Sequence, residues 1–234
     1  MVLAELEVFQ SRPIAPTRRV ALGRRELPVE PAPGFGGILL GAIAGAFIGG
    51  VDPDLRGDLV RLTHELEHGH RIPQPRLRHR YQTDPIGLTR RIHRLTGDGE
   101  TLSLDLADAD ATSPGPQVLA AIYAAGELPI EARPTVMRVV RRGLQWRGAV
   151  GDRLIQAVSG ARMDLSTAVA RYADPEAWAL GVLGLGGPTP ARPEVQRRFR
   201  ELIRLAHPDH GGGEVAAAER IAELSEARRI LLAS

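Results

Sequence analysis

An eighteen-residue stretch without a charged side chain, residues 34–51, constrains the fold of this chain more than any other segment. Glycine recurs in it at every fourth position, so a helix formed by this stretch has one face of small residues. Such a face lets another backbone approach closely, and the length just reaches the transmembrane range. The stretch therefore predicts a helix that is either buried in a protein core or placed in a membrane.

Strand patterns lie on both sides of this stretch. Residues 3–10 and 19–29 are strand-like, and the prolines between them indicate edge strands or extended arms. Residues 90–96 and 101–106 alternate around Gly97-Asp98-Gly99, which is typical of a hairpin, and residues 77–83 are a candidate third strand. These patterns predict a small antiparallel sheet.

Helical patterns alternate with these strands. A leucine stripe predicts a helix over residues 54–68. Three more helices are expected at 116–127, 133–143 and 150–158. Residues 1–172 are therefore predicted to form an N-terminal α+β domain, and the whole chain is expected to belong to the α+β class.

Two amphipathic patterns near the end of the chain flank the tripeptide His207-Pro208-Asp209. The proline stops the first helix, and glycines follow the tripeptide. A short connection then folds the two helices into an antiparallel hairpin with the tripeptide at its tip. The apolar positions are Val195, Phe199, Leu202 and Ala206 before the tripeptide, and Ala217, Ile221, Leu224 and Leu231 after it.

This hairpin resembles the J-domain of the DnaJ-like co-chaperones. Residues 178–185 (WALGVLGL) resemble the short first helix of that family, and residues 198–207 (RFRELIRLAH) resemble the second. Ile221, Leu224, Ala227 and Leu231 fall where the third helix of the family has its apolar residues. The resemblance covers roughly 176–234 and implies a C-terminal, all-α J-domain: an antiparallel helical hairpin plus a short first helix.

The resemblance implies a co-chaperone that docks a DnaK-class heat-shock chaperone and stimulates its ATPase. The ATPase chemistry would belong to the partner, so the chain itself is expected to be no enzyme and to need no cofactor. The N-terminal domain would then give client or location specificity. The implied partner-binding residues are His207, Pro208 and Asp209 in the loop, with Arg197, Arg198, Arg200 and Arg204 on the second helix.

The sequence departs from the family pattern at three positions. Glu201 and Leu205 stand where basic residues are common, and Arg228 replaces an aromatic residue of the third helix. These departures leave a second interpretation open, in which the hairpin is a degenerate J-like interaction module that binds nucleic acid or a partner protein.

The resemblance also decides between the two environments of residues 34–51. Four arginines precede this stretch and two aspartates follow it, so a membrane helix would leave the N-terminus in the cytoplasm and send the J-domain outward, away from ATP. An apolar run that begins this late is no secretory signal. We therefore expect a buried helix in a cytoplasmic protein, with no membrane association.

Composition limits the kinds of site and ligand that we expect for the chain. The chain contains no cysteine, which excludes disulfides and thiolate zinc sites. Its formal net charge of +2 predicts no general affinity for polyanions. All thirty basic residues are arginine, a bias that indicates a GC-rich bacterial genome.

One enzyme motif lies within the predicted helix 54–68. His64, Glu65 and His68 have the H-E-x-x-H spacing of zinc hydrolases, and His70 is a further candidate ligand. The leucine stripe places the first and last of these residues on the solvated face, where a zinc ion would have no walled cleft. A metallohydrolase is therefore the less favoured alternative, and exposed charge pairs are the simpler interpretation.

A basic segment gives a second alternative. Residues 71–94 contain seven arginines, His79 and His93 with a single acidic residue, which is a candidate nucleic-acid patch. The arginines alternate with apolar residues as on the solvated face of a sheet, and aspartates at 105, 108 and 110 are near enough in sequence to pair with them. Nucleic acid is therefore an unfavoured partner.

Overall fold

The computed structural model describes residues 1–12, 18–30, 32–70, 79–98, 101–108, 113–160, 173–186, 190–206 and 214–233. The chain is α+β and folds as two compact units, Met1–Met163 and Asp164–Ser234. The division between these units lies within residues 161–172, outside the described part, so the expected domain bounds of 1–172 and 176–234 stay a prediction.

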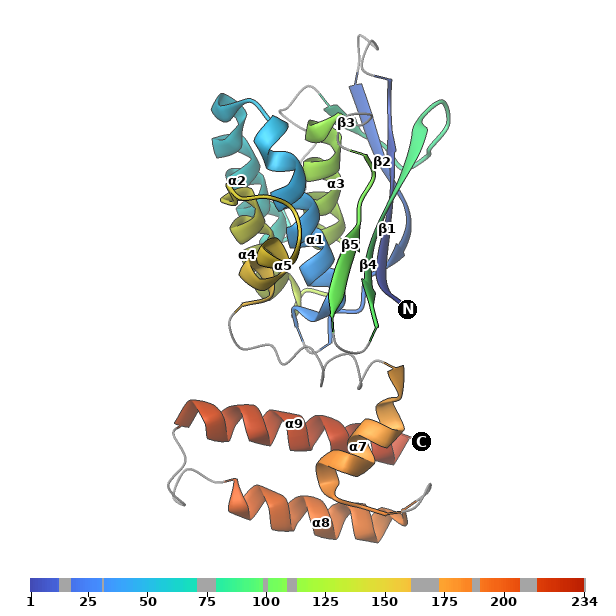
Figure 1. Ribbon diagram of the computed structural model, residues 1–234, viewed down its shortest axis with the longest axis vertical. Helices are drawn as coiled ribbons and strands as arrows, with labels where there is room; N and C mark the ends of the chain where they lie inside the picture. The colour runs from blue at the N-terminus through green and yellow to red at the C-terminus, as the bar shows by residue number, and fades with distance from the viewer. Residues whose placement is uncertain are drawn as a thin grey trace. The chain divides into compact units, whose positions relative to one another are not determined.

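In the described part of unit 1, five strands form one mixed sheet in the order β3-β2-β1-β4-β5 (Figure 1). The middle strand β1 pairs antiparallel with β2 and with β4, and β4 pairs antiparallel with β5 in the expected hairpin. The strands are β1 (Val2–Gln10), β2 (Arg18–Glu26), β3 (His79–Tyr81), β4 (Thr89–Gly97) and β5 (Leu102–Asp105).

Two expectations about the sheet were wrong. Strand β1 is the centre of the sheet and not an edge, because the prolines at 13 and 16 lie between the strands and remove no hydrogen-bond donor from β1. The sheet is also not purely antiparallel, since β3 pairs parallel with β2. More than fifty residues separate these two strands, enough for a crossover connection through helices.

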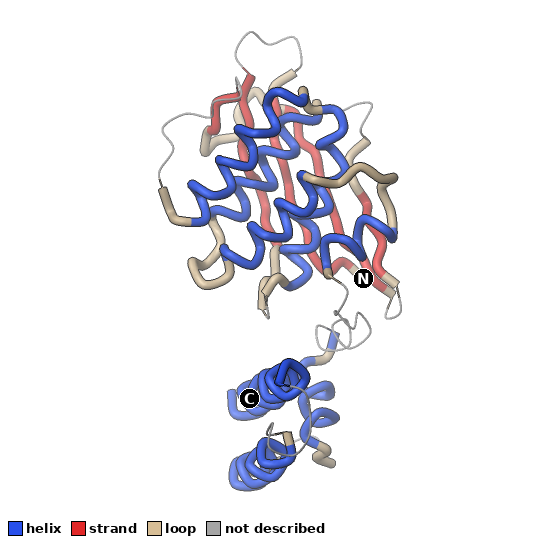
Figure 2. The backbone as a smooth tube through the Cα atoms, turned by 90° about the vertical axis from the view of Figure 1, so that its left-hand side faces the viewer, coloured by secondary structure: helices blue, strands red, loops and turns tan. Residues whose placement is uncertain are grey.

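The described helices of unit 1 lie on one side of the sheet (Figure 2). Helix α2 begins with Asp52 as its N-cap, whose side chain accepts a hydrogen bond from the backbone N of Asp54 at 3.0 Å. The helices are α1 (Gly34–Phe47), followed by a short 3-10 turn η1 (Ile48–Gly50), α2 (Pro53–Glu67), α3 (Pro114–Gly126), α4 (Arg133–Leu144) and α5 (Asp152–Ser159).

Helix α1 is the buried helix expected from the uncharged stretch. Nearly all of its residues are inaccessible, and Gly37, Gly41 and Gly45 face the neighbouring helices α4 and α5. A Cβ added at Gly41 would lie 2.6 Å from Val139 of α4, and one added at Gly143 of α4 would lie 2.1 Å from the carbonyl oxygen of Gly41. The small residues therefore let the α1 and α4 backbones touch, which larger side chains would prevent. Within the described residues, no helix is long and apolar enough to span a membrane.

Unit 2 consists, in its described part, of α7 (Pro175–Leu183), α8 (Arg192–Leu205) and α9 (Glu214–Ala233). Helices α8 and α9 lie side by side and run in opposite directions, with α7 packed against them (Figure 1). A hydrogen bond of 2.9 Å from Arg192 at the start of α8 to the carbonyl oxygen of Leu232 near the end of α9 fits this arrangement. The shared core consists of Ala179, Leu183, Val195, Leu224 and Ala227.

Candidate partner-binding site on helix α8

Helix α8 forms where its sequence favours a helix. Pro193 occupies the first turn, where its missing N–H leaves no hydrogen bond unmade, and Glu194 complements the positive end of the helix dipole. Val195 is fully buried, and Phe199 and Leu202 pack against the same core. The inward face of α8 is therefore apolar, and the opposite face is left to charged side chains.

Three of the predicted docking residues lie on that outward face. Arg197, Arg200 and Arg204 are spaced three and four residues apart, so their side chains leave the helix on one side, and all three are exposed. Two of them bond to their own helix: the Nε of Arg200 donates to the carbonyl oxygen of Gln196 (3.2 Å), and that of Arg204 donates to the carbonyl oxygen of Arg200 (3.3 Å). We call these three arginines the arginine face.

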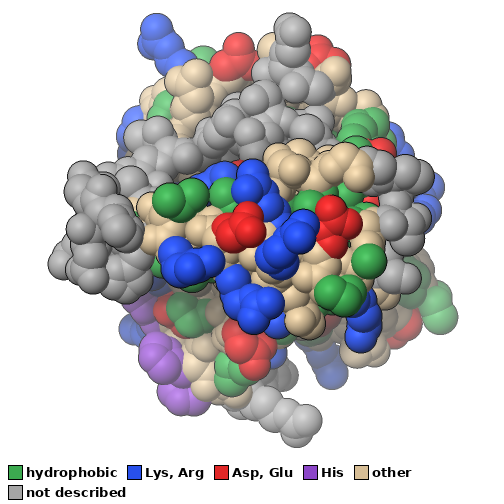
Figure 3. All heavy atoms as spheres, turned by 90° about the horizontal axis from the view of Figure 1, so that it is seen from below, with side chains coloured by type: hydrophobic (Ala, Val, Ile, Leu, Met, Phe, Trp, Pro, Cys, Tyr) green, Lys and Arg blue, Asp and Glu red, His purple; other side chains and the backbone are tan. Residues whose placement is uncertain are grey.

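In the described part of the chain, the positive charge of the arginine face is not offset by ion pairs. Within the described residues, no carboxylate lies within ion-pair distance of Arg197, Arg200 or Arg204. Figure 3, which views the molecule from the α8 side of unit 2, shows several basic side chains gathered with only a few acidic ones between them. A surface of this kind attracts an acidic partner and orients it during encounter.

The fourth predicted docking residue, Arg198, forms its hydrogen bonds within unit 2. Its Nε donates to the carbonyl oxygen of Leu183 at the end of α7 (2.9 Å), and its Nη1 donates to Glu201 (3.1 Å). Gly184 ends α7 in the left-handed conformation with φ of 61°, and a Cβ there would lie 3.2 Å from Arg198. The side chain of Arg198 therefore holds α7 against α8, which the grouping of four arginines in the sequence did not reveal.

Besides Glu201, two other residues depart from the J-domain pattern, Arg228 and Leu205, and the structure describes both. The guanidinium carbon of Arg228 on α9 lies 4.8 Å from the centre of the Phe199 ring, so the arginine covers the core by a cation–π contact. Leu205, the last residue of α8, is 71% exposed. The loop residues His207, Pro208 and Asp209 lie outside the described residues.

The H-E-x-x-H residues lie at the C-terminal end of α2. His68 follows the end of α2, and its Nδ1 lies 2.7 Å from the backbone carbonyl oxygen of His64, while its ring stacks on that of His70. Both His64 and His68 are exposed. Among the described side chains, no group of three histidine or carboxylate residues is placed to hold a metal ion.

Glu67, one residue before His68, has a structural contact instead. Its carboxylate accepts a hydrogen bond of 2.6 Å from Nη1 of Arg141 on α4, and both side chains are largely buried. Arg141 Nη1 also lies 3.3 Å from the hydroxyl of Thr63. This ion pair joins α2 to α4 and explains the charge at a position where a zinc-protease helix usually has none.

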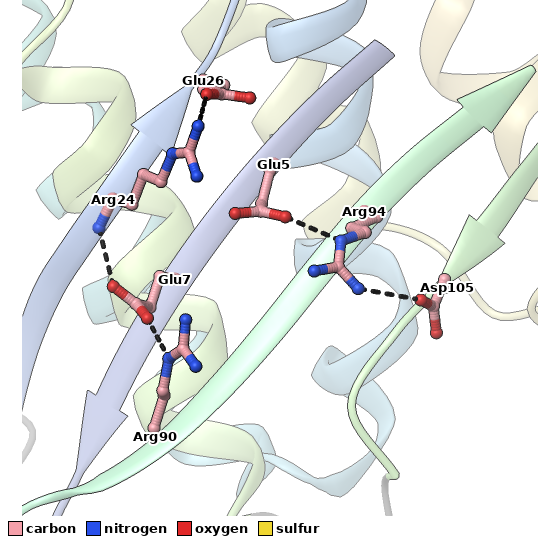
Figure 4. Close-up of polar contacts among 7 residues, drawn as sticks. All are labelled: Glu5, Glu7, Arg24, Glu26, Arg90, Arg94 and Asp105. Atoms are coloured by element: carbon pink, nitrogen blue, oxygen red, sulfur yellow. Dashed lines mark hydrogen bonds and ion pairs between the residues drawn. The ribbon is translucent and has the colours of Figure 1, made fainter. Parts of the chain in front are cut away.

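The described arginines of segment 71–94 are partly neutralised by β1. Figure 4 shows Glu5 and Glu7 on the sheet face away from the helices, with Arg94 and Arg90 of β4 reaching toward them. Arg94 Nε donates to Glu5 at 2.7 Å and its Nη1 lies 3.7 Å from Asp105; Arg90 donates to Glu7. The predicted pairing with Asp105 is thus present, but the main partners come from β1.

Glu7 is also bound from the other side. It accepts a hydrogen bond of 2.9 Å from the backbone N of Arg24, and this bond with the contact to Arg90 lowers its pKa. Gly23 makes room, since a Cβ there would lie 2.1 Å from the Glu7 carboxylate. The sequence analysis missed both glutamates, although the pairing of Glu5 with Arg94, directly opposite in β4, is a cross-strand charge pattern.

His93 belongs to a buried network on the helix side of the sheet. The backbone N of Ala107 donates to its Nδ1 (3.3 Å), so Nε2 carries the proton and donates to Gln117 of α3 (2.7 Å). Gln117 in turn donates to Gln10 of β1 (2.7 Å). Burial lowers the pKa of His93, so this residue of the candidate nucleic-acid segment is a neutral core residue.

Comparison with known proteins gives no family for the chain: no protein-family model, no curated protein and no solved structure matches it.

Proposed function

We propose that the chain is a cytoplasmic J-domain co-chaperone that docks a DnaK-class heat-shock chaperone and stimulates its ATPase. The observation that carries the proposal is the arginine face: Arg197, Arg200 and Arg204 point away from a three-helix core, on the helix that precedes the His-Pro-Asp tripeptide in the sequence. In the family that this segment resembles, the corresponding helix docks the chaperone and the tripeptide triggers hydrolysis.

The arrangement of unit 2 supports the proposal in two further ways. The short helix α7 and the antiparallel pair of α8 and α9 are the elements that the J-domain resemblance predicts, in the same order along the chain. The core residues Leu183, Leu224 and Ala227 lie in the segments and positions on which the resemblance was based. Unit 1, with its own sheet and core, would supply client or location specificity.

Single-turnover ATP hydrolysis by the DnaK-class chaperone of the same organism tests the proposal. The full chain should accelerate hydrolysis, and His207→Gln should abolish the acceleration without changing helicity. Arg200→Ala and Arg204→Ala should each raise the concentration needed for half-maximal stimulation, since each removes a charge that faces the partner. Arg229→Ala, on the exposed side of α9, is the matched control and should have little effect.

The absence of stimulation by a folded wild-type chain would contradict the proposal. The degenerate interaction module would then be the better interpretation, and a retained affinity for the chaperone without stimulation would support it. Filter binding of nucleic acid at two salt concentrations addresses the remaining alternative, and we expect no affinity at low salt because Arg90 and Arg94 are paired with Glu7 and Glu5.

A further inference from the structure

The last side chain of helix α8, Leu205, is apolar but does not pack into the core of unit 2. Leu205 is 71% exposed, whereas Leu202, one turn earlier, packs against the core of unit 2. Single exposed leucines are common on protein surfaces and need no special explanation. The surroundings of Leu205 on α8 are what make it informative.

Leu205 lies at the same end of α8 as Arg204. The two side chains leave the helix about 100° apart, and Leu205 stands one helical turn after Glu201, which is its neighbour on the helix surface. Glu201 accepts a hydrogen bond from Arg198 at 3.1 Å, and the two charges offset each other. Leu205 thus lies next to the neutralised ion pair, and Glu201 stands between it and the arginine face around the helix.

A partner that covers the C-terminal end of α8 contacts both Arg204 of the arginine face and Leu205. Protein interfaces place apolar contacts together and leave charges at the rim, where the charges guide encounter but contribute little affinity. The exposed ends of arginine side chains are costly to desolvate, while an exposed leucine gains from losing its contact with water. Leu205 is therefore the position on this surface where contact with a partner adds most to the lifetime of a complex.

We infer that Leu205 is an apolar anchor of the α8 interface. This inference rests on the proposed function and specifies the partner's surface: a groove with acidic side chains opposite the arginine face and an apolar pocket at the end that meets the C-terminus of α8. The arginine face sets the rate of encounter, and Leu205 slows dissociation.

The test measures chaperone ATPase stimulation and binding as functions of the concentration of the full chain. Leu205→Ala should raise the half-maximal concentration about tenfold and leave the maximal rate unchanged, because truncating an anchor weakens binding without altering the loop. Leu205→Met keeps an apolar side chain and should restore most of the affinity. Ile130→Ala, which truncates a residue of unit 1 with 60% exposure, is the matched control and should equal wild type.

Salt dependence separates the two parts of the surface. Arg204→Ala should reduce the sensitivity of binding to salt, whereas Leu205→Ala should weaken binding equally at low and high salt. A stimulating wild type with an unaffected Leu205→Ala variant would overturn the inference and leave the proposed function standing. A wild type that neither binds nor stimulates the chaperone would overturn both.

Discussion

Arg198 on helix α8 donates a hydrogen bond of 2.9 Å from its Nε to the backbone carbonyl oxygen of Leu183, the last residue of helix α7. The last carbonyls of a helix have no partner within the helix, so this bond satisfies one of them. The same guanidinium pairs with Glu201 one turn further along α8. One side chain thus joins two helices of unit 2 and differs in role from its neighbour Arg197, which is exposed.

Arg198→Ala should therefore lower the stability of unit 2. Loss of the bond to Leu183 and of the contact with Glu201 should reduce the free energy of unfolding by about 1–2 kcal/mol. Urea denaturation followed by Trp178 fluorescence, in a Trp146→Phe background, reports on unit 2 because these are the two tryptophans of the chain. Arg197→Ala should change the same free energy by less than about 0.5 kcal/mol; equal effects of the two substitutions would contradict the assigned roles.

The contact between α1 and α4 predicts opposite effects for two helical glycines. Gly143→Ala places a Cβ 2.1 Å from the carbonyl oxygen of Gly41, and backbone on both sides prevents an easy adjustment. We expect a loss of about 3 kcal/mol or more in the free energy of unfolding. Gly57 in α2 has no atom within 4 Å of an added Cβ.

Gly57→Ala should accordingly stabilise unit 1 by about 0.5–1 kcal/mol, because alanine has the higher helix propensity. Thermal unfolding followed by circular dichroism compares the two variants directly. A mild effect of Gly143→Ala would mean that the helices can separate at this crossing, and the close contact of α1 with α4 would then be wrong.

Helix α1 and the sheet show what local sequence patterns can and cannot predict. The small-residue spacing of α1 correctly predicted a buried helix with a close neighbour, because both properties depend on residues within one element. The same patterns misplaced β1 and the direction of β3, because strand order depends on residues far apart in sequence. The phase of the α8 stripe could have distinguished Arg198 from Arg197, since consecutive residues leave a helix about 100° apart.

The buried network of His93 predicts a dependence of stability on pH. Burial lowers the pKa of His93 below its ordinary value of 6.5, against smaller opposing effects of Gln117 and Asp105. The unfolded chain therefore binds a proton at a pH where the folded chain does not. Stability should be unaffected by this group well above pH 6.5 and should fall below it, by up to about 1.4 kcal/mol per pH unit, until the lowered pKa is reached.

Urea midpoints between about pH 7.5 and 5.5 measure this slope. His93→Gln, which cannot titrate, should be less stable than wild type at the upper end and should show a flatter slope. His64→Gln changes an exposed residue and should retain the slope of the wild type. A slope that His93→Gln leaves unchanged would assign the effect to other groups.

The ion pair of Glu67 with Arg141 predicts that substitutions at Glu67 and at Glu65 differ in their effect on the free energy of unfolding. Glu67→Ala leaves Arg141 without its carboxylate in a largely buried position, and we expect a loss of about 1–3 kcal/mol in the free energy of unfolding. Glu65→Ala should change it by less than about 0.5 kcal/mol. A chelator should leave the unfolding temperature unchanged, because no three histidine or carboxylate side chains in the described part of the chain are placed to hold a metal ion. If His64 and His68 held a metal ion, the chelator would lower the unfolding temperature, since ligand binding stabilises the folded state.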